Sequence, residues 1–397
     1  MPGRTSLSDL GFGTRAVHPR KPASQPGEPI APVLDQSSTY SFTDSAEFAR
    51  ASADKTGAGY VYTRWGNPTL DALAEAIAYL EGTETAETYS SGMAAISGTL
   101  LALCSPGDRI VSSRQLYGGT HSLTTTLLPR FDIQTTKCDV DDYDAVKAAL
   151  PGAKLLYCET IGNPAIRVAD LGRWGELAAD AGVPLVVDNT FASPVLCRPV
   201  EYGARIVVHS ATKFIGGHHD LIGGVVCADA ETIEQLRGLT RELGPTLAPF
   251  NAWLCLRGLQ SIHLRVPRSS DTALDLARYL GSHPEIERVF YPALESNEDY
   301  EITKKILGGR GGGTLAFEVK GGRGRAARFQ EKLRVIMAAA SLGGSHSLIV
   351  HAASVTHTQL TEDELRAAGI SPGFCRLSVG LEDPDDLIAD LEQALAP

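Results

Sequence analysis

The stretch VVHSATKFIGGHHD, residues 207–220, carries the strongest indication of both fold and chemistry in this sequence. It begins as an apolar, β-branched run that is typical of a buried strand, and then passes through Ser210 and Thr212 to a single lysine, Lys213. In open α/β sheets, functional residues gather at the carboxyl ends of the strands. A lone lysine at a strand end is usually a solvated surface group, so the neighbouring sequence has to decide between the two interpretations.

Several short apolar runs share the character of this strand, and helical segments separate a number of them. Strands that are buried on both faces and joined by helices predict a mainly parallel, doubly covered sheet, and hence α/β construction. The runs are DRIVSS (108–113), KLLYCET (154–160), PLVVDN (184–189), RIVVHS (205–210) and GGVVCA (223–228).

The chain has 397 residues, which is too long for one simple core. The sequence predicts three parts. Residues 1–63 are rich in Pro, Ser and Gly and are expected to form an N-terminal arm that contacts a neighbouring subunit. Residues 64–260 are expected to form the large domain, and residues 261–397 a smaller C-terminal α+β domain.

Composition narrows the function classes. The net charge is −11, from 36 basic and 47 acidic residues, which disfavours nucleic-acid binding. One basic cluster, GGRGRAAR at 321–328, fits a solvated loop entering a helix better than an RNA site. The seven cysteines form no CxxC pair, which favours buried thiols in a cytoplasmic protein. Neither a signal peptide nor a membrane span is expected from the apolar runs.

A helix start and two hydroxyl groups predict an anion site. The turn SSGM, residues 90–93, opens a predicted helix, and Gly92 permits close approach of the backbone. Free amides at a helix N-terminus bind anions, because the helix dipole points the same way. Ser210 and Thr212 would add hydroxyl donors to the same anion, so a phosphate group is expected there.

An acid, an aromatic ring and the lysine complete a pattern that suggests pyridoxal 5′-phosphate (PLP). Lys213 would form the Schiff base with the cofactor. Asp188, at the end of PLVVD, would keep the pyridine nitrogen protonated, so that the ring can take up electrons from a substrate carbanion. Tyr117 would stack on the ring face. The adjacent His218 and His219 have no evident further ligands, so no metal site is predicted.

Motifs along nearly the whole chain support this interpretation. They are YVYTRWGNPT (60–69), SSGMAAI (90–96), LYGGT (116–120), the stretch 188–224, GPTLAPFNAWLCLRGL (244–259), SLGGSHSL (341–348), Thr356 with His357, and RLSVGLEDPDDL (376–387). In these motifs and their order the chain resembles the PLP enzymes of Cys/Met metabolism, which include γ-lyases, cystathionine β-lyases, cystathionine γ-synthases and O-acylhomoserine sulfhydrylases. The resemblance implies the type I PLP-dependent transferase fold, similar to aspartate aminotransferase, and a homotetramer of two tight dimers.

The resemblance also implies roles for the residues around the cofactor. Lys213 matches the Schiff-base lysine and, once released, the base that moves substrate protons. Asp188 matches the partner of the ring nitrogen, and Tyr117 matches the stacking residue that protonates the leaving sulfur. The positions that match the phosphate-binding residues are Gly92, Met93, Ser210 and Thr212.

Two further groups of residues are assigned by the same resemblance. Tyr62 and Arg64 match a pair that reaches the phosphate of the adjacent subunit, and Tyr62 also approaches the substrate. Arg376 matches the arginine that binds the substrate carboxylate. Ser341 and Asn163 match residues that position that group.

Two apolar positions indicate the substrate. In cystathionine-handling relatives an acidic residue commonly precedes the serine of SLGG, and often another precedes the tyrosine of Y-x-R. Here these positions hold Ala340 and Val61, so the distal ammonium of cystathionine would be buried without compensation. We therefore expect γ-elimination of L-methionine, or of a close thioether amino acid, to methanethiol, 2-oxobutanoate and ammonia.

Other positions keep alternatives open. Gly119, in YGGT, is more typical of cystathionine enzymes than of well-known methionine γ-lyases, which have YGCT. Gly343 and Gly344 differ from the GD of the sulfhydrylases, and His346 stands where Glu or Lys is expected. The alternatives are cystathionine γ-lyase or γ-synthase, and γ-replacement of the O-acylhomoserine sulfhydrylase type. A non-catalytic binding protein is disfavoured, because every catalytic residue is present.

Overall fold

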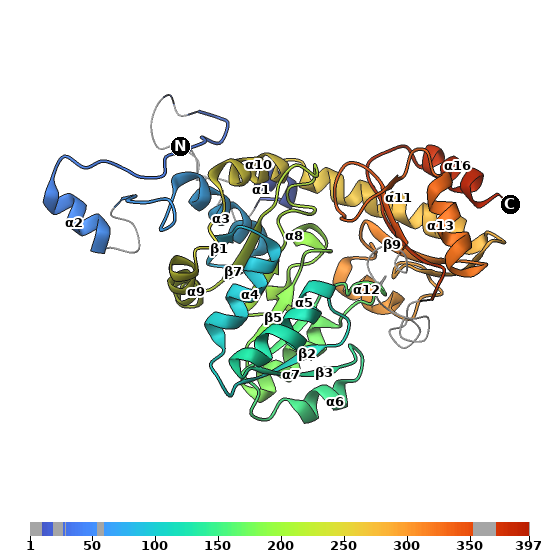
Figure 1. The fold of residues 1–397 in the computed structure, drawn as a ribbon, viewed down its shortest axis with the longest axis horizontal. Helices are drawn as coiled ribbons and strands as arrows, with labels where there is room; N and C mark the ends of the chain where they lie inside the picture. Colours follow the sequence, from blue (N-terminus) through green and yellow to red (C-terminus); the bar gives the residue numbers. More distant parts are fainter. Residues whose placement is uncertain (1–9, 19–26, 28, 54–58, 352–370, 397) are drawn as a thin grey trace.

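The computed structural model describes residues 10–18, 27, 29–53, 59–351 and 371–396. Within these ranges the chain forms two sheets with their helices, and an N-terminal segment that extends from the body (Figure 1). The predicted motif at Thr356 and His357 lies outside the described residues. Within the described ranges, every helix is too short or too polar to cross a lipid bilayer.

The larger sheet has seven strands in the order β1-β7-β6-β5-β4-β2-β3. The strands are β1 (Thr85–Tyr89), β2 (Arg109–Ser113), β3 (Gln134–Cys138), β4 (Leu155–Glu159), β5 (Leu185–Asp188), β6 (Ile206–His209) and β7 (Gly224–Ala228). β7 is antiparallel to both of its neighbours, whereas the pairs that join β6, β5, β4, β2 and β3 are parallel. The prediction of a mainly parallel sheet is confirmed.

Two strands of this sheet escaped the sequence analysis, and both lie at its edges. β1 has the sequence TAETY and β3 has QTTKC, and both are only partly buried. An edge strand has a neighbour on one side alone, so it can be polar and short. The search for apolar runs therefore found the central strands and missed these two.

Helices cover both faces of the larger sheet. They are α3 (Pro68–Glu81), α4 (Gly92–Leu103), α5 (Gly118–Ser122), α6 (Tyr143–Ala149), α7 (Leu171–Ala181), α8 (Ser193–Leu196), α9 (Ala230–Leu243) and α10 (Pro249–Leu259), with shorter turns at Leu123–Leu127, Leu128–Phe131 and Pro199–Tyr202. Trp174 of α7 packs in one core with Val187 of β5, and Ile96 of α4 packs in the other with Val186. Successive residues of one strand therefore feed two cores.

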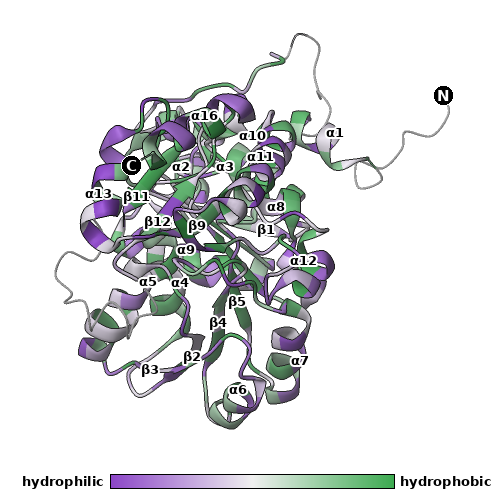
Figure 2. Cartoon of the chain, turned by 90° about the vertical axis from the view of Figure 1, so that its right-hand side faces the viewer, coloured by the Kyte–Doolittle hydropathy of each residue, from purple (hydrophilic) through white to green (hydrophobic). Residues whose placement is uncertain are grey.

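The smaller sheet has five strands in the order β10-β11-β12-β9-β8. Its strands are β8 (Ile286–Phe290), β9 (Thr314–Val319), β10 (Met337–Ala338), β11 (Leu348–His351) and β12 (Phe374–Ser378), and the helices of this half are α11 (Ile262–Ser282), α12 (Tyr300–Leu307), α13 (Gly322–Lys332) and α16 (Pro384–Leu395). Leu276 of α11, Phe329 of α13 and Leu391 of α16 share one core with Phe317 of β9. Figure 2 shows the apolar residues in central strands such as β4 and β5, and polar residues on outer helices such as α13.

The N-terminal segment carries two short helices, α1 (Phe12–Val17) and α2 (Ser45–Ala53). The predicted arm therefore contains regular helical structure. α2 stands apart from the body of the chain (Figure 1), and Ala51 is its one buried residue. The indole nitrogen of Trp253 in α10 donates to the carbonyl of Pro32 at 2.9 Å, which ties the segment to the body.

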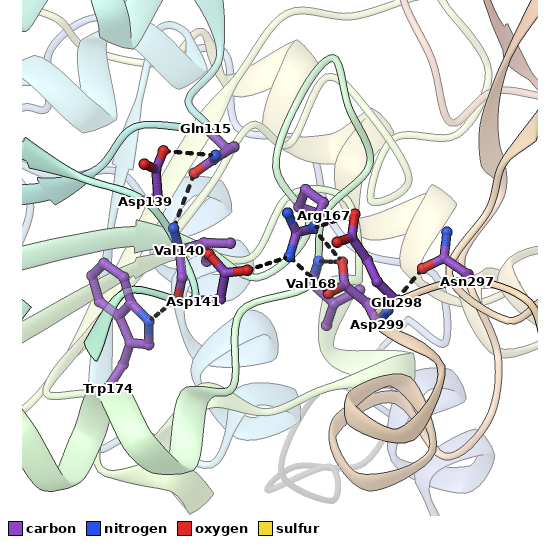
Figure 3. Close-up of polar contacts among 10 residues, drawn as sticks. All are labelled: Gln115, Asp139, Val140, Asp141, Arg167, Val168, Trp174, Asn297, Glu298 and Asp299. Atoms are coloured by element: carbon purple, nitrogen blue, oxygen red, sulfur yellow. Dashed lines mark hydrogen bonds and ion pairs between the residues drawn. The ribbon is translucent and has the colours of Figure 1, made fainter. Parts of the chain in front are cut away.

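An ion pair joins the loop after β4 to the start of α12 (Figure 3). Arg167 donates from Nε to Asp299 Oδ2 at 2.8 Å and from Nη2 to Asp299 Oδ1 at 3.2 Å. The same carboxylate accepts the Val168 amide at 2.9 Å, and its side chain is 2% exposed. Arg167 Nη2 also lies 3.0 Å from Asp141 Oδ2, whose side chain is 54% exposed.

We expect Asp299→Ala to lower the free energy of unfolding by about 3 kcal/mol, because it removes the buried partner of a largely buried guanidinium and the acceptor of a buried amide. Asp141→Ala removes one of two exposed partners of the same guanidinium, the other being Glu298, and should cost less than ~1 kcal/mol. Urea denaturation of the two variants measures the difference. Equal losses of unfolding free energy in the two variants would show that burial does not determine how much each partner of Arg167 contributes to stability.

Candidate active site

The parallel strands bring polar residues to one edge of the larger sheet. Glu159, at the end of β4, is in register with Asp188 at the end of β5, and Asp188 is in register with Val208 of β6. Ser210 directly follows β6. Thr190 connects these ends, because its amide donates to Asp188 Oδ1 at 3.0 Å and its hydroxyl accepts the Ser210 amide at 2.8 Å.

Four of the predicted site residues meet in one cluster. Lys213 Nζ donates to Ser341 Oγ at 2.9 Å. Arg376 donates from Nη2 to the carbonyl of Ser341 at 3.3 Å and from Nη1 to Asn163 Oδ1 at 3.0 Å. The cluster joins the segment after β6, the loop before β11, and β12, and so combines both halves of the chain.

Among the residues that the structure describes, Lys213 and Arg376 have no carboxylate partner. Burial lowers the pKa of Lys213 to about 8, with a further contribution from the positive charge of Arg376. Burial also lowers the pKa of Arg376. In the described part of the chain, their hydrogen bonds go to neutral oxygens of Ser341 and Asn163. The arrangement therefore favours an incoming anion, such as a substrate carboxylate.

Glu159 holds two site loops in place, which is a role that the sequence analysis did not assign. Its Oε1 accepts the backbone amide of Tyr117 at 2.5 Å, and the backbone of Asn163 also hydrogen-bonds its carboxyl. Burial, followed by the negative charge of Asp188, raises the pKa of Glu159. Nearby, Gln115 Oε1 accepts the amide of Val140 at 3.2 Å (Figure 3). The sequence offered one signal for this role, which is an acidic residue at the end of a wholly buried strand.

Tyr117 and Met93 close over Gly119. A Cβ atom placed on Gly119 would lie 2.5 Å from Tyr117 Cε1 and 2.7 Å from Met93 Sδ. Tyr117 is 46% exposed and lies within electrostatic range of Arg376. The ring therefore lies near the cluster of Lys213, Ser341, Arg376 and Asn163, with an exposed surface.

The start of α4 has the donors that an anion needs. Ser91 is its N-cap, and the Ser91 hydroxyl accepts the Ala94 amide at 3.1 Å. In the described residues, the amides of Gly92 and Met93 have no helical partner, as expected for the first turn. A Cβ on Gly92 would lie 2.6 Å from Ser210 Cβ, so glycine permits this close approach.

Asp188 needs a positive partner in this fold. The residue is buried, and burial raises the pKa of its carboxyl, while Thr190 and His209 act in the opposite direction. A protonated ring nitrogen beside it would supply the missing charge. The carboxyl of Asp188, the free amides at the start of α4 and the amine of Lys213 are together the groups that PLP requires, so these residues fit the cofactor.

A buried polar network lies behind the site. Thr160 Oγ1 donates to Asn189 Oδ1 at 2.8 Å, and Asn189 Nδ2 donates to Glu81 Oε1 at 2.9 Å. The same oxygen lies 2.6 Å from His209 Nε2. Thr160, Asn189 and His209 are chain neighbours of Glu159, Asp188 and Ser210, respectively. The network therefore fixes the strand ends from the opposite face of the sheet.

Other predicted residues have local partners in this single chain. The hydroxyl of Thr212 accepts the Gly223 amide at 3.0 Å. Arg64 donates to the carbonyl of Arg241 at 2.5 Å, and its guanidinium lies 5.6 Å from the centre of the Tyr62 ring. The contacts described for Tyr62 and Arg64 are thus with nearby residues of the same segment, such as Trp65, and with α9. None of them is with the Lys213 cluster.

Comparison with known proteins gives the family. Residues 13–396 match the model of the Cys/Met metabolism PLP-dependent enzymes. An L-methionine gamma-lyase from Fusobacterium nucleatum is 41% identical over 97% of this chain and 98% of its own. An O-succinylhomoserine sulfhydrylase from Pseudomonas aeruginosa is 39% identical over 99% of this chain and 97% of its own.

A solved structure supports the same assignment. It is a putative O-acetylhomoserine (thiol)-lyase from Campylobacter jejuni, with a TM-score of 0.91 and 34% identity over 97% of this chain and all of that chain, and it contains a pyridoxyl-lysine phosphate group. The expected type I fold, the PLP cofactor and the enzyme class of PLP-dependent carbon–sulfur lyases are confirmed. This chain belongs to the Cys/Met metabolism family of PLP-dependent enzymes.

Proposed function

We propose that this enzyme catalyses the γ-elimination of L-methionine, or of a close thioether amino acid, to methanethiol, 2-oxobutanoate and ammonia. The observation that carries the proposal is the apolar character of Ala340, which adjoins Ser341 of the cluster that can bind an amino-acid carboxylate, and of Val61 in the N-terminal arm, which a neighbouring subunit would bring to the site. The L-methionine gamma-lyase among the relatives supports the same reaction.

The substrate carboxylate would bind to Arg376. Its guanidinium is held at two points, by Asn163 Oδ1 at 3.0 Å and by the Ser341 carbonyl at 3.3 Å. These neutral partners orient the fork without neutralising it, so the remaining donors can face a carboxylate. Fixing the carboxylate would place the Cα–H bond toward Lys213.

Lys213 would move the substrate protons. Its pKa of about 8 keeps part of the amine neutral near neutral pH, which a general base requires. PLP, when bound, supplies the electron sink that stabilises negative charge at Cα. The Lys213 amine would take the Cα proton and return protons as the elimination proceeds, while Asp188 keeps the ring nitrogen charged.

Tyr117 would handle the leaving group. Its ring lies beside Arg376 and stands over Gly119, in reach of the cofactor region. A phenol needs nearby positive charge to exchange protons near neutral pH. Within this chain, Arg376 lies close enough to Tyr117 to supply such a charge. The phenol would then protonate the departing sulfur.

The N-terminal arm would complete the site of a second subunit. Tyr62 and Trp65 are 43% and 42% exposed, and Arg64 lies beside both rings. In a homotetramer built from two tight dimers, Tyr62 and Arg64 would reach the neighbour's phosphate, where the amides of Gly92 and Met93 and the hydroxyls of Ser210 and Thr212 would also bind. We further propose a cytoplasmic location, and keep the division into an arm (1–63), a large domain (64–260) and a C-terminal domain (261–397).

A second reaction is γ-replacement on an O-acylhomoserine. The O-succinylhomoserine sulfhydrylase among the relatives is nearly as similar as the methionine enzyme, 39% against 41% identity. Both reactions use the same carboxylate clamp and base, and they differ in the leaving group and in the nucleophile that follows.

The first test is a substrate panel that scores keto acid and thiol together. We expect methionine to release both, and cystathionine to react at least ~10-fold more slowly, because its distal ammonium lacks a carboxylate. Ala340→Glu should reduce the difference in rate between methionine and cystathionine. Ala340→Gln, which matches the size of glutamate without its charge, should leave that difference unchanged. Preferential use of cystathionine by the unaltered enzyme, or of an O-acylhomoserine with sulfide, would refute the proposal.

A second test concerns the space over Gly119. Gly119→Ala should reduce kcat by about 10-fold, because the added methyl group would lie 2.5 Å from Tyr117 Cε1 and 2.7 Å from Met93 Sδ in this chain, which lacks the adjustment that enzymes with YGCT make for their cysteine at this position. Gly118→Ala is the matched control, since a Cβ there meets nothing within 4 Å. Steady-state kinetics on methionine compares the two. Equal kcat values for both variants would exclude the proposed role of the Tyr117 position.

A further inference from the structure

Two loops cross beside the catalytic lysine. The first, residues 213–219, follows β6, and the second, residues 341–346, precedes β11 in the C-terminal half. A Cβ on Gly343 would lie 2.7 Å from the Phe214 amide nitrogen, and a Cβ on Gly344 would lie 2.0 Å from His219 Nε2. The imidazole of His219 thus packs directly against the backbone of the second loop.

Backbone strain marks this crossing. His219 has φ 60° and Ser341 has φ 142°, and both lie in the region that favours glycine. Strained residues persist when their surroundings hold them, and they gather at functional sites. One strained residue lies in each loop, so the contact fixes both loops at an energetic cost.

The ring of His219 is hydrogen-bonded to the backbone of His346. The rings of His219 and His346 lie 6.3 Å apart between their centres. The adjacent His218 points its Nδ1 to the carbonyl of Gly216 at 2.8 Å, within its own loop. Of the two neighbouring histidines, His219 is therefore the one that bridges the halves of the chain.

We propose that His219 is a positioning residue, whose ring anchors the loop 341–346 to the lysine segment and thereby holds Ser341 where it orients Arg376. The proposal rests on the role of Arg376 in binding the substrate carboxylate, as argued above. It gives a function to one of two adjacent histidines, neither of which had been assigned a role.

The loop needs an anchor that does not depend on Lys213. The bond from Lys213 to Ser341 uses the same amine that the cofactor binds, so it cannot serve once that amine is engaged. The other bonds of the loop hold it to its own half: Gly343 donates to Ser378 Oγ at 3.1 Å, and the Ser345 carbonyl accepts from Leu381 at 2.9 Å. The imidazole of His219 supplies a contact between this loop and the large domain that does not involve the amine of Lys213.

The test compares three variants as PLP-loaded enzymes. His219→Gly removes the ring and fits the positive φ, so it adds no backbone strain. His219→Asn tolerates the same backbone and keeps a side-chain donor. His218→Ala is the matched control, because it removes an imidazole that stays within its own loop.

Hydrogen–deuterium exchange of a peptide covering residues 341–347 is the first measurement. We expect at least ~5-fold faster exchange in His219→Gly, partial restoration in His219→Asn, and no change in His218→Ala. This measurement needs no substrate, so it distinguishes failure of the anchor from failure of the proposed reaction. Unchanged exchange in His219→Gly would overturn the inference.

Steady-state kinetics is the second measurement, with whichever amino acid proves best in the panel. We expect KM to rise about 10-fold in His219→Gly with kcat within ~2-fold, because the carboxylate clamp loses its orientation. His219→Asn should recover much of the loss. A fall in kcat with unchanged KM, or equal effects of His218→Ala, would show that His219 does not act through the clamp.

Discussion

The hydrogen bond between the amine of Lys213 and the hydroxyl of Ser341 joins the two halves of this protein at their reactive point. It holds a buried amine against a neutral oxygen, beside a second cation, Arg376. Burial and the neighbouring charge lower the pKa of the amine to about 8, which makes the lysine a usable nucleophile and base. In the described part of the chain the two cations are held without a carboxylate, which costs stability, and the cofactor and substrate would supply the anions.

In the larger sheet, some residues at the strand ends face the site, and their chain neighbours hold the strand ends in place. Residues at the ends of β4, β5 and β6 face the site, whereas their chain neighbours enter the buried network around Glu81. Because side chains alternate along a strand, one short stretch provides both the residues that face the site and the residues of the network behind it. Glu159 adds a third connection, since it holds the loops of Tyr117 and Asn163 by their backbones.

The sequence predicted the parts of this design that are local. Apolar runs identified the central strands, the SSGM turn identified the start of α4, and ordered motifs selected Lys213, Asp188 and Arg376 as candidate site residues. It missed β1 and β3, because edge strands can be polar. Contacts between distant loops that no motif pairs were also beyond it, such as that of His219 with Gly344, since no local pattern records which loops cross.

The most direct measurement locates the cofactor on the chain. The PLP-loaded protein would be reduced with borohydride and digested, and the pyridoxyl phosphate group would be mapped by mass spectrometry. We predict that the group is on Lys213 and is absent from the Lys213→Ala variant. Lys137 is the competing amine, because burial and Arg114 also lower its pKa. A pyridoxyl group on Lys137, or on any lysine other than Lys213, would contradict the account.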